Sequence, residues 1–253
     1  MKALKIIATS VVALAGALTS ASAGDLKLDT APASRFIEVD VHALGGGGSV
    51  TQNYCKLFPQ IENLNVNMGG NFGIGGRAVF GLREYLGLGT AIDFTVTNYD
   101  TDMLVYGQAD SEGISAAYID NIIYKVTVPV FVSLRFNVDR SVRWNIDAGL
   151  YYSYGLGGRQ KQKIFRGEIN AMGELVTERE NLTTDYYHSG ATFINVYNRG
   201  DIGVHIGTSL NFGPHLLVGG QLQYGFKNSA RKTGVVDPRV HNLSVNAVLG
   251  YRF

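Results

Sequence analysis

The chain ends with His241-Asn242-Leu243-Ser244-Val245-Asn246-Ala247-Val248-Leu249-Gly250-Tyr251-Arg252-Phe253. Apolar residues occupy every second position from Leu243 to Phe253, and most of the positions between them are polar or glycine. A period of two with one apolar face predicts a β-strand that separates an apolar from a polar environment. The rest of the chain decides whether that apolar face meets a protein core or a lipid bilayer.

The amino terminus predicts export. Lys2 and Lys5 form a basic region, 6–18 is apolar, and Ala21 and Ala23 form a small-residue cleavage site. This pattern is typical of a secretory signal peptide, and its apolar run is shorter than the roughly 20 residues of a membrane-spanning helix. The expected organisation is a signal peptide over 1–23, a periplasmic linker over 24–34 and one domain over 35–253.

Composition favours strands and turns over disorder. The chain has 32 glycines and 14 tyrosines but only 5 prolines, and its formal net charge is +1. Disorder requires low hydrophobicity and high net charge, and a nucleic-acid partner is not expected at this charge balance. Because Cys55 is the single cysteine, an internal disulfide is excluded. A bystander thiol is favoured, with an intermolecular disulfide or a ligand-reactive thiol as the alternatives.

Alternation of apolar and polar residues predicts eight strands. They run over 35–44, 68–81, 86–98, 122–137, 142–155, 201–212, 216–226 and 241–253. The connections alternate between short (82–85, 138–141, 213–215) and long (45–67, 99–121, 156–200, 227–240). Short periplasmic turns and long extracellular loops are typical of outer-membrane barrels, and we expect strand extensions over 114–122 and 192–197.

Charge is confined to one face of these strands. The apolar face carries no Asp, Glu, Lys or Arg, whereas the polar face carries an expected interior charge network of Glu38, Asp40, Asp93, Asp147 and Asp201 with Arg77, Lys125, Arg135, Arg143 and Arg252. A charge facing lipid costs roughly 2–4 kcal/mol at the bilayer midplane. Unpaired buried charges are also costly, so five acids facing five bases fit a barrel filled by ion pairs. A soluble barrel would show the reverse pattern.

Aromatic residues cluster near the predicted strand ends. Five lie at the periplasmic ends (Tyr85, Phe136, Trp144, Phe212, Phe253) and five at the outer ends (Tyr124, Tyr152, Tyr154, Tyr224, Phe226). Two such girdles are typical of proteins that cross a bilayer.

Three stretches carry a family resemblance: Tyr124 to Phe136, Asp147 to Tyr152 and the run from Asn198 to Phe226. In these stretches the chain resembles Bacteroidetes outer-membrane barrel proteins of the PorT-like or OmpA/OmpX-like kind. The resemblance covers essentially the whole mature chain. It implies that Tyr251 and Phe253 form the signal read by the barrel insertion machinery.

Other candidate sites have simpler interpretations. The glycine runs 45–48 and 73–76 do not lie between a strand and a helix, so turn flexibility and tight interior packing are favoured over a phosphate loop. His42 and His205 are expected to face inward beside acids as hydrogen-bonded residues, with a metal site or proton relay as the alternative. His241 is expected on the lipid face near the outer rim, where a lipid-deacylating barrel could place a catalytic histidine, but no nucleophilic serine or orienting acid is evident beside it. Lys161, Lys163 and Arg166 form a basic cluster in an expected outer loop, where a plain solvated loop is favoured over contact with anionic surface polysaccharide.

The sequence therefore predicts an all-β fold, an eight-stranded antiparallel up-and-down barrel that spans the outer membrane. We expect a non-enzymatic protein without cofactor or metal, whose extracellular loops serve surface contact or envelope integrity. The expected partners are outer-membrane lipid and lipopolysaccharide, the insertion machinery and a surface ligand. A narrow porin-like channel, an outer-leaflet lipid-modifying enzyme and an accessory part of a secretion system remain alternatives.

Overall fold

The structure, a computed structural model, describes residues 27–28, 36–106, 114–139, 141–169, 172, 174–187, 197–230 and 237–253. The predicted signal peptide and most of the linker lie outside these residues. No helix in the described part of the chain is long and apolar enough to cross a membrane.

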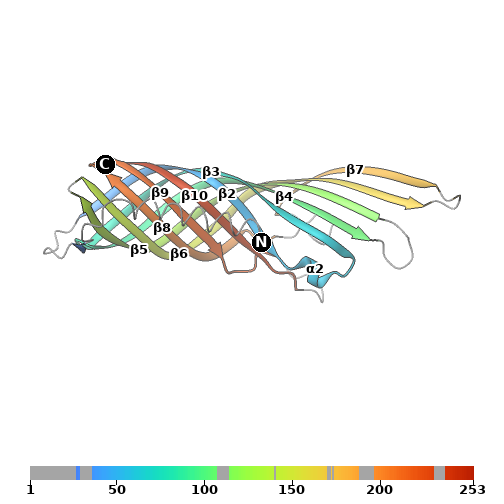
Figure 1. The fold of residues 1–253 in the computed structure, drawn as a ribbon, viewed down its shortest axis with the longest axis horizontal. Helices are drawn as coiled ribbons and strands as arrows, with labels where there is room; N and C mark the ends of the chain where they lie inside the picture. The colour runs from blue at the N-terminus through green and yellow to red at the C-terminus, as the bar shows by residue number, and fades with distance from the viewer. Residues whose placement is uncertain are drawn as a thin grey trace.

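Eight strands close into a ring. They are β2 (Ile37–Gln52), β3 (Ile61–Arg83), β4 (Leu86–Tyr106), β5 (Ile114–Asp139), β6 (Val142–Ile169), β8 (Gly200–Phe212), β9 (Leu216–Gly225) and β10 (Val240–Arg252). Each pairs antiparallel with its neighbour in chain order, and β6 reaches β8 directly because β7 (Leu175–Asp185) pairs only with the outer part of β6. The ring closes where β10 pairs with β2, from Val240 opposite Gln52 to Arg252 opposite Asp40 (Figure 1). The predicted eight-stranded up-and-down barrel is confirmed.

The barrel is apolar outside and polar inside. Ile37, Val39 and Val41 of β2 are 68, 44 and 49 % exposed, whereas the alternate residues Asp40 and His42 are 1 and 8 % exposed. The same alternation runs through the other strands of the ring, whose outward residues include Ile74, Ile92, Val130, Leu150, Ile206, Val218 and Leu249. This inside-out pattern suits strands between lipid and a polar interior.

The predicted short turns lie at one end of the barrel, which we call the periplasmic end. They link β3 to β4, β5 to β6 and β8 to β9. Gly213, in the last of these turns, has a φ of 57°, a left-handed conformation that glycine adopts without steric cost. The two residues of β1 (Lys27–Leu28) lie in the predicted linker and pair with Phe136 and Asn137 of β5.

The opposite, outer end differs from the expectation of long loops. β3 begins at Ile61, β4 reaches Tyr106, β5 begins at Ile114, and β6 and β7 form a further hairpin, so much of the expected loops 45–67, 99–121 and 156–200 is strand. The described residues of the fourth expected loop, 227–240, join β10 only at Val240. A short helix, α2 (Tyr54–Leu57), follows β2. We call the resulting sheet, built from 61–68, 98–106, 114–122, 159–169 and 175–185, the extracellular sheet; it projects far beyond the barrel in Figure 1. The expected extension over 114–122 is confirmed, while 192–196 lies outside the described residues.

The glycine run 45–48 is also strand rather than loop. A Cβ on Gly46 would collide with the Val245 carbonyl oxygen, and one on Gly48 would collide with the Thr97 side chain. Glycine is depleted in strands, which is why the sequence pattern placed the strand end at Leu44. The expected tight packing is present at Gly46 and Gly48, within a strand.

Candidate functional site: a charged barrel interior beneath a tyrosine cap

Three arginines converge on one glutamate at the periplasmic end of the barrel. Glu38 accepts hydrogen bonds from Arg135 at 2.6 Å, Arg143 at 3.0 Å and Arg252 at 3.2 Å. The guanidinium of Arg135 also lies 3.6 Å from the centre of the Phe36 ring. We call this group the periplasmic tier. It ties β2, β5, β6 and β10 together across the lumen.

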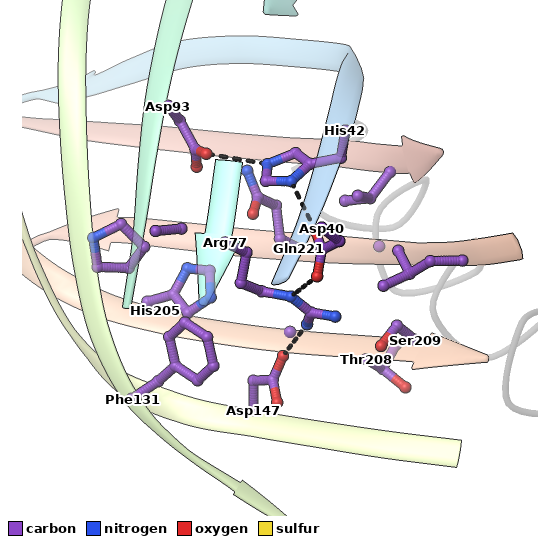
Figure 2. A pocket seen from close by; sticks show the side chains of 16 residues that line it. Asp40, His42, Arg77, Asp93, Phe131, Asp147, His205, Thr208, Ser209 and Gln221 are labelled. Atoms are coloured by element: carbon purple, nitrogen blue, oxygen red, sulfur yellow. Dashed lines mark hydrogen bonds and ion pairs between the residues drawn. The ribbon is translucent and has the colours of Figure 1, made fainter. Parts of the chain in front are cut away.

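The central tier consists of Asp40, His42, Arg77, Asp93 and Asp147 (Figure 2). Arg77 bridges two acids, with Nε 2.7 Å from Asp40 Oδ2 and Nη1 3.0 Å from Asp147 Oδ2. His42 bridges two acids as well, with Nδ1 3.1 Å from Asp40 and Nε2 2.9 Å from Asp93. Such charge-assisted hydrogen bonds are about twice as strong as neutral ones, so this tier fastens β2, β3, β4 and β6 to one another.

The outer tier surrounds Asp201. Its Oδ2 accepts hydrogen bonds from Tyr151 Oη at 2.9 Å and from Asn242 Nδ2 at 2.9 Å. Lys125 lines the same small cavity as Asp201. Of the ten residues predicted to form the interior charge network, the structure brings Glu38, Arg135, Arg143 and Arg252 into one group, Asp40, Arg77 and Asp147 into another, and joins Asp93 to the second through His42.

A cluster of tyrosines covers the interior at the outer end. Tyr186 stacks on Tyr197 with ring centres 4.5 Å apart, and its hydroxyl lies 2.7 Å from that of Tyr99. Tyr54 on α2 and Tyr187 complete the group, which packs with Val50, Ile61, Ile123 and Val240. Burial raises the pKa of Tyr54 and of Tyr186 well above the ordinary value, so these phenols stay neutral. We call this group the tyrosine cap.

The interior leaves little free space. One cavity of about 30 Å³ lies among Asp40, His42, Asp93 and Asp147, and another of about 30 Å³ lies between Lys125, Asp201 and the tyrosine cap. A third, of about 10 Å³, lies under Tyr54. Spaces of this size hold roughly one or two water molecules each. The described side chains thus fill the lumen with polar and charged groups.

The other predicted site residues are dispersed. His205 is buried, and its ring centre lies 5.5 Å from that of Phe131. Its Nδ1 lies 3.4 Å from Gln223 Nε2. His241 stacks on Tyr224, and Cys55 is exposed on α2. Among the described residues, no group of three or more His, Cys, Asp or Glu side chains is placed to hold a metal ion.

Only part of the expected basic cluster forms, because Lys161 and Lys163 share the outward face of β6 and Arg166 does not. Lys163 pairs with Tyr118 and Asn181 in the sheet and faces outward, whereas Arg166 lies on the opposite face and reaches Glu180 at 3.3 Å. The separation arises because 163 and 166 have opposite parity in a strand, and side chains alternate faces there. Because the sequence predicts a loop over 156–200, it does not predict that these residues lie on opposite faces of a strand.

Sequence reasoning missed the tyrosine cap and the double role of His42. Tyr54, Tyr99, Tyr186 and Tyr197 are spread over more than 140 positions and come from four segments, so no local pattern connects them. The alternation that set His42 two residues from Asp40 on one face was a signal for their contact. Asp93, 51 positions away, was not identifiable as its second partner.

A closed antiparallel barrel with an apolar outer wall and a charged lumen defines the class of transmembrane β-barrels. The chain belongs to the outer membrane protein beta-barrel domain family, whose model matches residues 42–231. It is an integral protein of the outer membrane. The predicted family is confirmed at this level, and the narrower PorT-like assignment stays a prediction.

Solved structures of similar fold include three outer-membrane proteins. Ail of Yersinia pestis, in complex with the heparin analogue sucrose octasulfate, is 13 % identical over 86 % of this chain and 99 % of that chain, with a TM-score of 0.34. Neisserial surface protein A is 11 % identical over 87 % and 100 %, with a TM-score of 0.35. OprG of Pseudomonas aeruginosa is 11 % identical over 90 % and 99 %, with a TM-score of 0.37. A comparison with curated proteins found no match.

Proposed function

We propose that the protein serves surface contact, and that its contact element is the free edge of β7 in the extracellular sheet. β7 pairs with β6 on one side, and within the described residues no strand pairs with its other side. Every residue from Val176 to Asn181 is exposed. An exposed edge strand presents unpaired N–H and C=O groups to which an extended peptide can add as a further strand.

The side chains of β7 limit which partner fits. Glu178, Arg179 and Glu180 are exposed charges, and charged side chains protect a free edge from indiscriminate pairing. A partner strand needs complementary charges opposite them, because like charges directly across a strand pair are destabilising. The proposed ligand is therefore an extended protein segment of mixed charge.

The filled lumen favours this function over a narrow solute channel. The cavities of the interior are separate and small, and the periplasmic and central tiers place charged side chains across the bore. The predicted absence of enzymatic activity stays a prediction. A role as an accessory part of a secretion system has no specific observation in its favour.

The free edge can be tested with a strand probe. The segment Arg159–Ile169 of β6 is the natural partner of β7, so a fluorescent peptide of that sequence should bind to cells that display the full chain, and a scrambled peptide should not. Successive N–H groups of a strand point to opposite edges. Two double variants are compared, Glu178→Pro/Glu180→Pro and Thr177→Pro/Arg179→Pro. The double variant that removes N–H groups from the free edge should weaken peptide binding at least ten-fold. It should also leave the β6–β7 hairpin protease-resistant.

The functional readout is attachment of the same cells to epithelial monolayers. Attachment should fall with the edge-directed proline variant in parallel with peptide binding. Equal binding of the scrambled peptide would refute strand addition, and unchanged attachment with lost peptide binding would refute the surface-contact function.

An envelope-integrity role is the second candidate, with lipopolysaccharide as the partner. Arg159, Lys161 and Lys163 form an outward row on β6 that rises from the lipid-facing wall, where lipopolysaccharide phosphates lie. Asp185 and Asp120 stand opposite Arg159 and Lys161 and offset part of this charge. Lys161→Gln/Lys163→Gln should increase detergent sensitivity of the cells if this row binds lipopolysaccharide; unchanged sensitivity would exclude it.

A further inference from the structure

A shallow groove of about 780 Å³ lies on the outer wall of the barrel, across β10, β2, β3 and β4. Ala43 of β2 stands directly between Ile74 of β3 and Leu249 of β10, which are 68 and 59 % exposed. The short side chain between two long ones makes the depression. Phe94 and Tyr251 line it further along.

The packing of the barrel interior does not account for the small residues beside this depression. In the next row outward, Gly45 stands between Phe72 and Ala247, and a Cβ on Gly45 would meet nothing closer than the Phe72 ring at 4.0 Å. Gly46 beside it faces inward and has no room for a Cβ. Glycine weakens a strand interior, yet the interior packing of the barrel does not require it at position 45.

The groove begins at the periplasmic boundary of the bilayer and runs toward its midplane. Leu216, the first residue of β9, and Tyr251, near the end of β10, line its lower end. The Tyr251 ring stacks on exposed His215 with centres 5.0 Å apart, and tyrosines at this level are typical of the membrane–water boundary. A barrel strand crosses the hydrocarbon in about 9–11 residues, so Ala43, six positions above Ile37, lies near the middle of the bilayer.

The occupant follows from the surface that surrounds the groove. The side chains that line it from the outer wall are apolar or aromatic, and the groove is continuous with the lipid-facing surface of an integral outer-membrane protein. Acyl chains already contact that surface. We propose that this groove holds one acyl chain of a phospholipid from the periplasmic leaflet, and that it retains this lipid when neighbouring lipids exchange.

The test is lipid retention by the full chain. The protein, extracted in mild detergent and supplied with phosphatidylethanolamine, is examined by native mass spectrometry at increasing collision energy. Wild type should keep one phospholipid per chain, and Ala43→Phe, which fills the groove, should lower that occupancy at least ten-fold. Val132→Phe enlarges an equally apolar exposed position on β5, outside the groove, and should retain the lipid as wild type does.

Folding is checked for each variant by heat-modifiable gel mobility. If Ala43→Phe does not fold, Gly45→Leu extends into the open space next to the groove and should lower the occupancy in the same way. Equal retention by wild type and the folded groove variants would overturn the proposal. Loss of lipid from wild type at the lowest collision energy, or a dimer mass that Ala43→Phe abolishes, would overturn it as well, the latter by pointing to a second copy as the occupant.

Discussion

Removal of Arg77 should destabilise the barrel because Asp147 loses its cation and Asp40 keeps only its contact with His42. The Arg77 side chain is 11 % exposed and bonds Asp40 at 2.7 Å and Asp147 at 3.0 Å. A hydrogen bond to a charged group contributes about 1.5–3 kcal/mol, so two contribute about 3–6 kcal/mol. Loss of one partner from a buried ion pair costs about 3–5 kcal/mol. We therefore expect Arg77→Met to lower the free energy of unfolding by about 3–5 kcal/mol.

The assay is urea unfolding of the protein in phospholipid vesicles. Trp144, the single tryptophan, lies on β6 in the barrel wall and donates a hydrogen bond to Thr208 Oγ1 at 2.7 Å, so its fluorescence reports on the barrel. Arg166→Met is the matched control, since Arg166 and Glu180 are each 52 % exposed. Exposed pairs contribute about 0–1 kcal/mol.

A triple variant separates charge from packing. Arg77→Met combined with Asp40→Asn and Asp147→Asn removes the unpaired charges, so it should recover part of the loss seen for Arg77→Met alone. Equal losses for Arg77→Met and Arg166→Met would refute the assignment of Arg77 to a tightly paired interior. The assignment would also be refuted if the triple variant were less stable than Arg77→Met by the sum of the losses that Asp40→Asn and Asp147→Asn cause separately.

Three further changes test the wall, the terminus and the extracellular sheet. Val130→Arg places a charge on the lipid face and should cost about 2–4 kcal/mol near the midplane, measured by heat-modifiable mobility and urea unfolding; assembly equal to wild type would contradict the lipid-face assignment. Removal of Phe253 should slow insertion into the outer membrane, measured by pulse-chase fractionation, and a normal rate would count against the terminal signal. Burial and the neighbouring Asp120 and Asp102 raise the pKa of Asp100, so the folded state holds the Asp100 proton more tightly than the unfolded state does. Asp100→Asn should therefore increase protease resistance of the extracellular sheet at pH 7, and the gain should vanish as the pH falls below the ordinary value of 3.8; a gain of equal size at low pH would contradict it.

The tyrosine cap and the central tier make different contributions to the same closed lumen. The tyrosines pack as neutral rings beyond the membrane-crossing part, and the charged residues pair across the bore within it. This arrangement places apolar burial where the barrel meets water and ion pairs where the wall meets lipid. A surface role through the extracellular sheet does not require the lumen to open.

The face of each membrane-crossing strand was determined by the sequence alone. A period of two separates two faces whatever the neighbouring strands are, so Val39 and Val41 had to face away from Asp40. The lack of charge on the apolar face then identified lipid as its surroundings. The short turns were predicted from the few residues that separate consecutive alternating segments. Strand ends at the outer side were predicted poorly, because alternation among asparagines, glycines and lysines beyond the bilayer has no hydrophobic contrast.

Only the tertiary structure decided which charges meet. Alternation places a residue on a face but leaves the register between strands open, and register depends on pairing around the whole ring. Arg252 and Glu38 are 214 positions apart and meet at 3.2 Å because β10 closes on β2. The same closure sets Ala43 between Ile74 and Leu249, and the folded segments at the outer end bring Tyr99, Tyr186 and Tyr197 together. These contacts join segments that are distant in the sequence. They are therefore determined by the register and closure of the whole barrel and not by the pattern of any one strand.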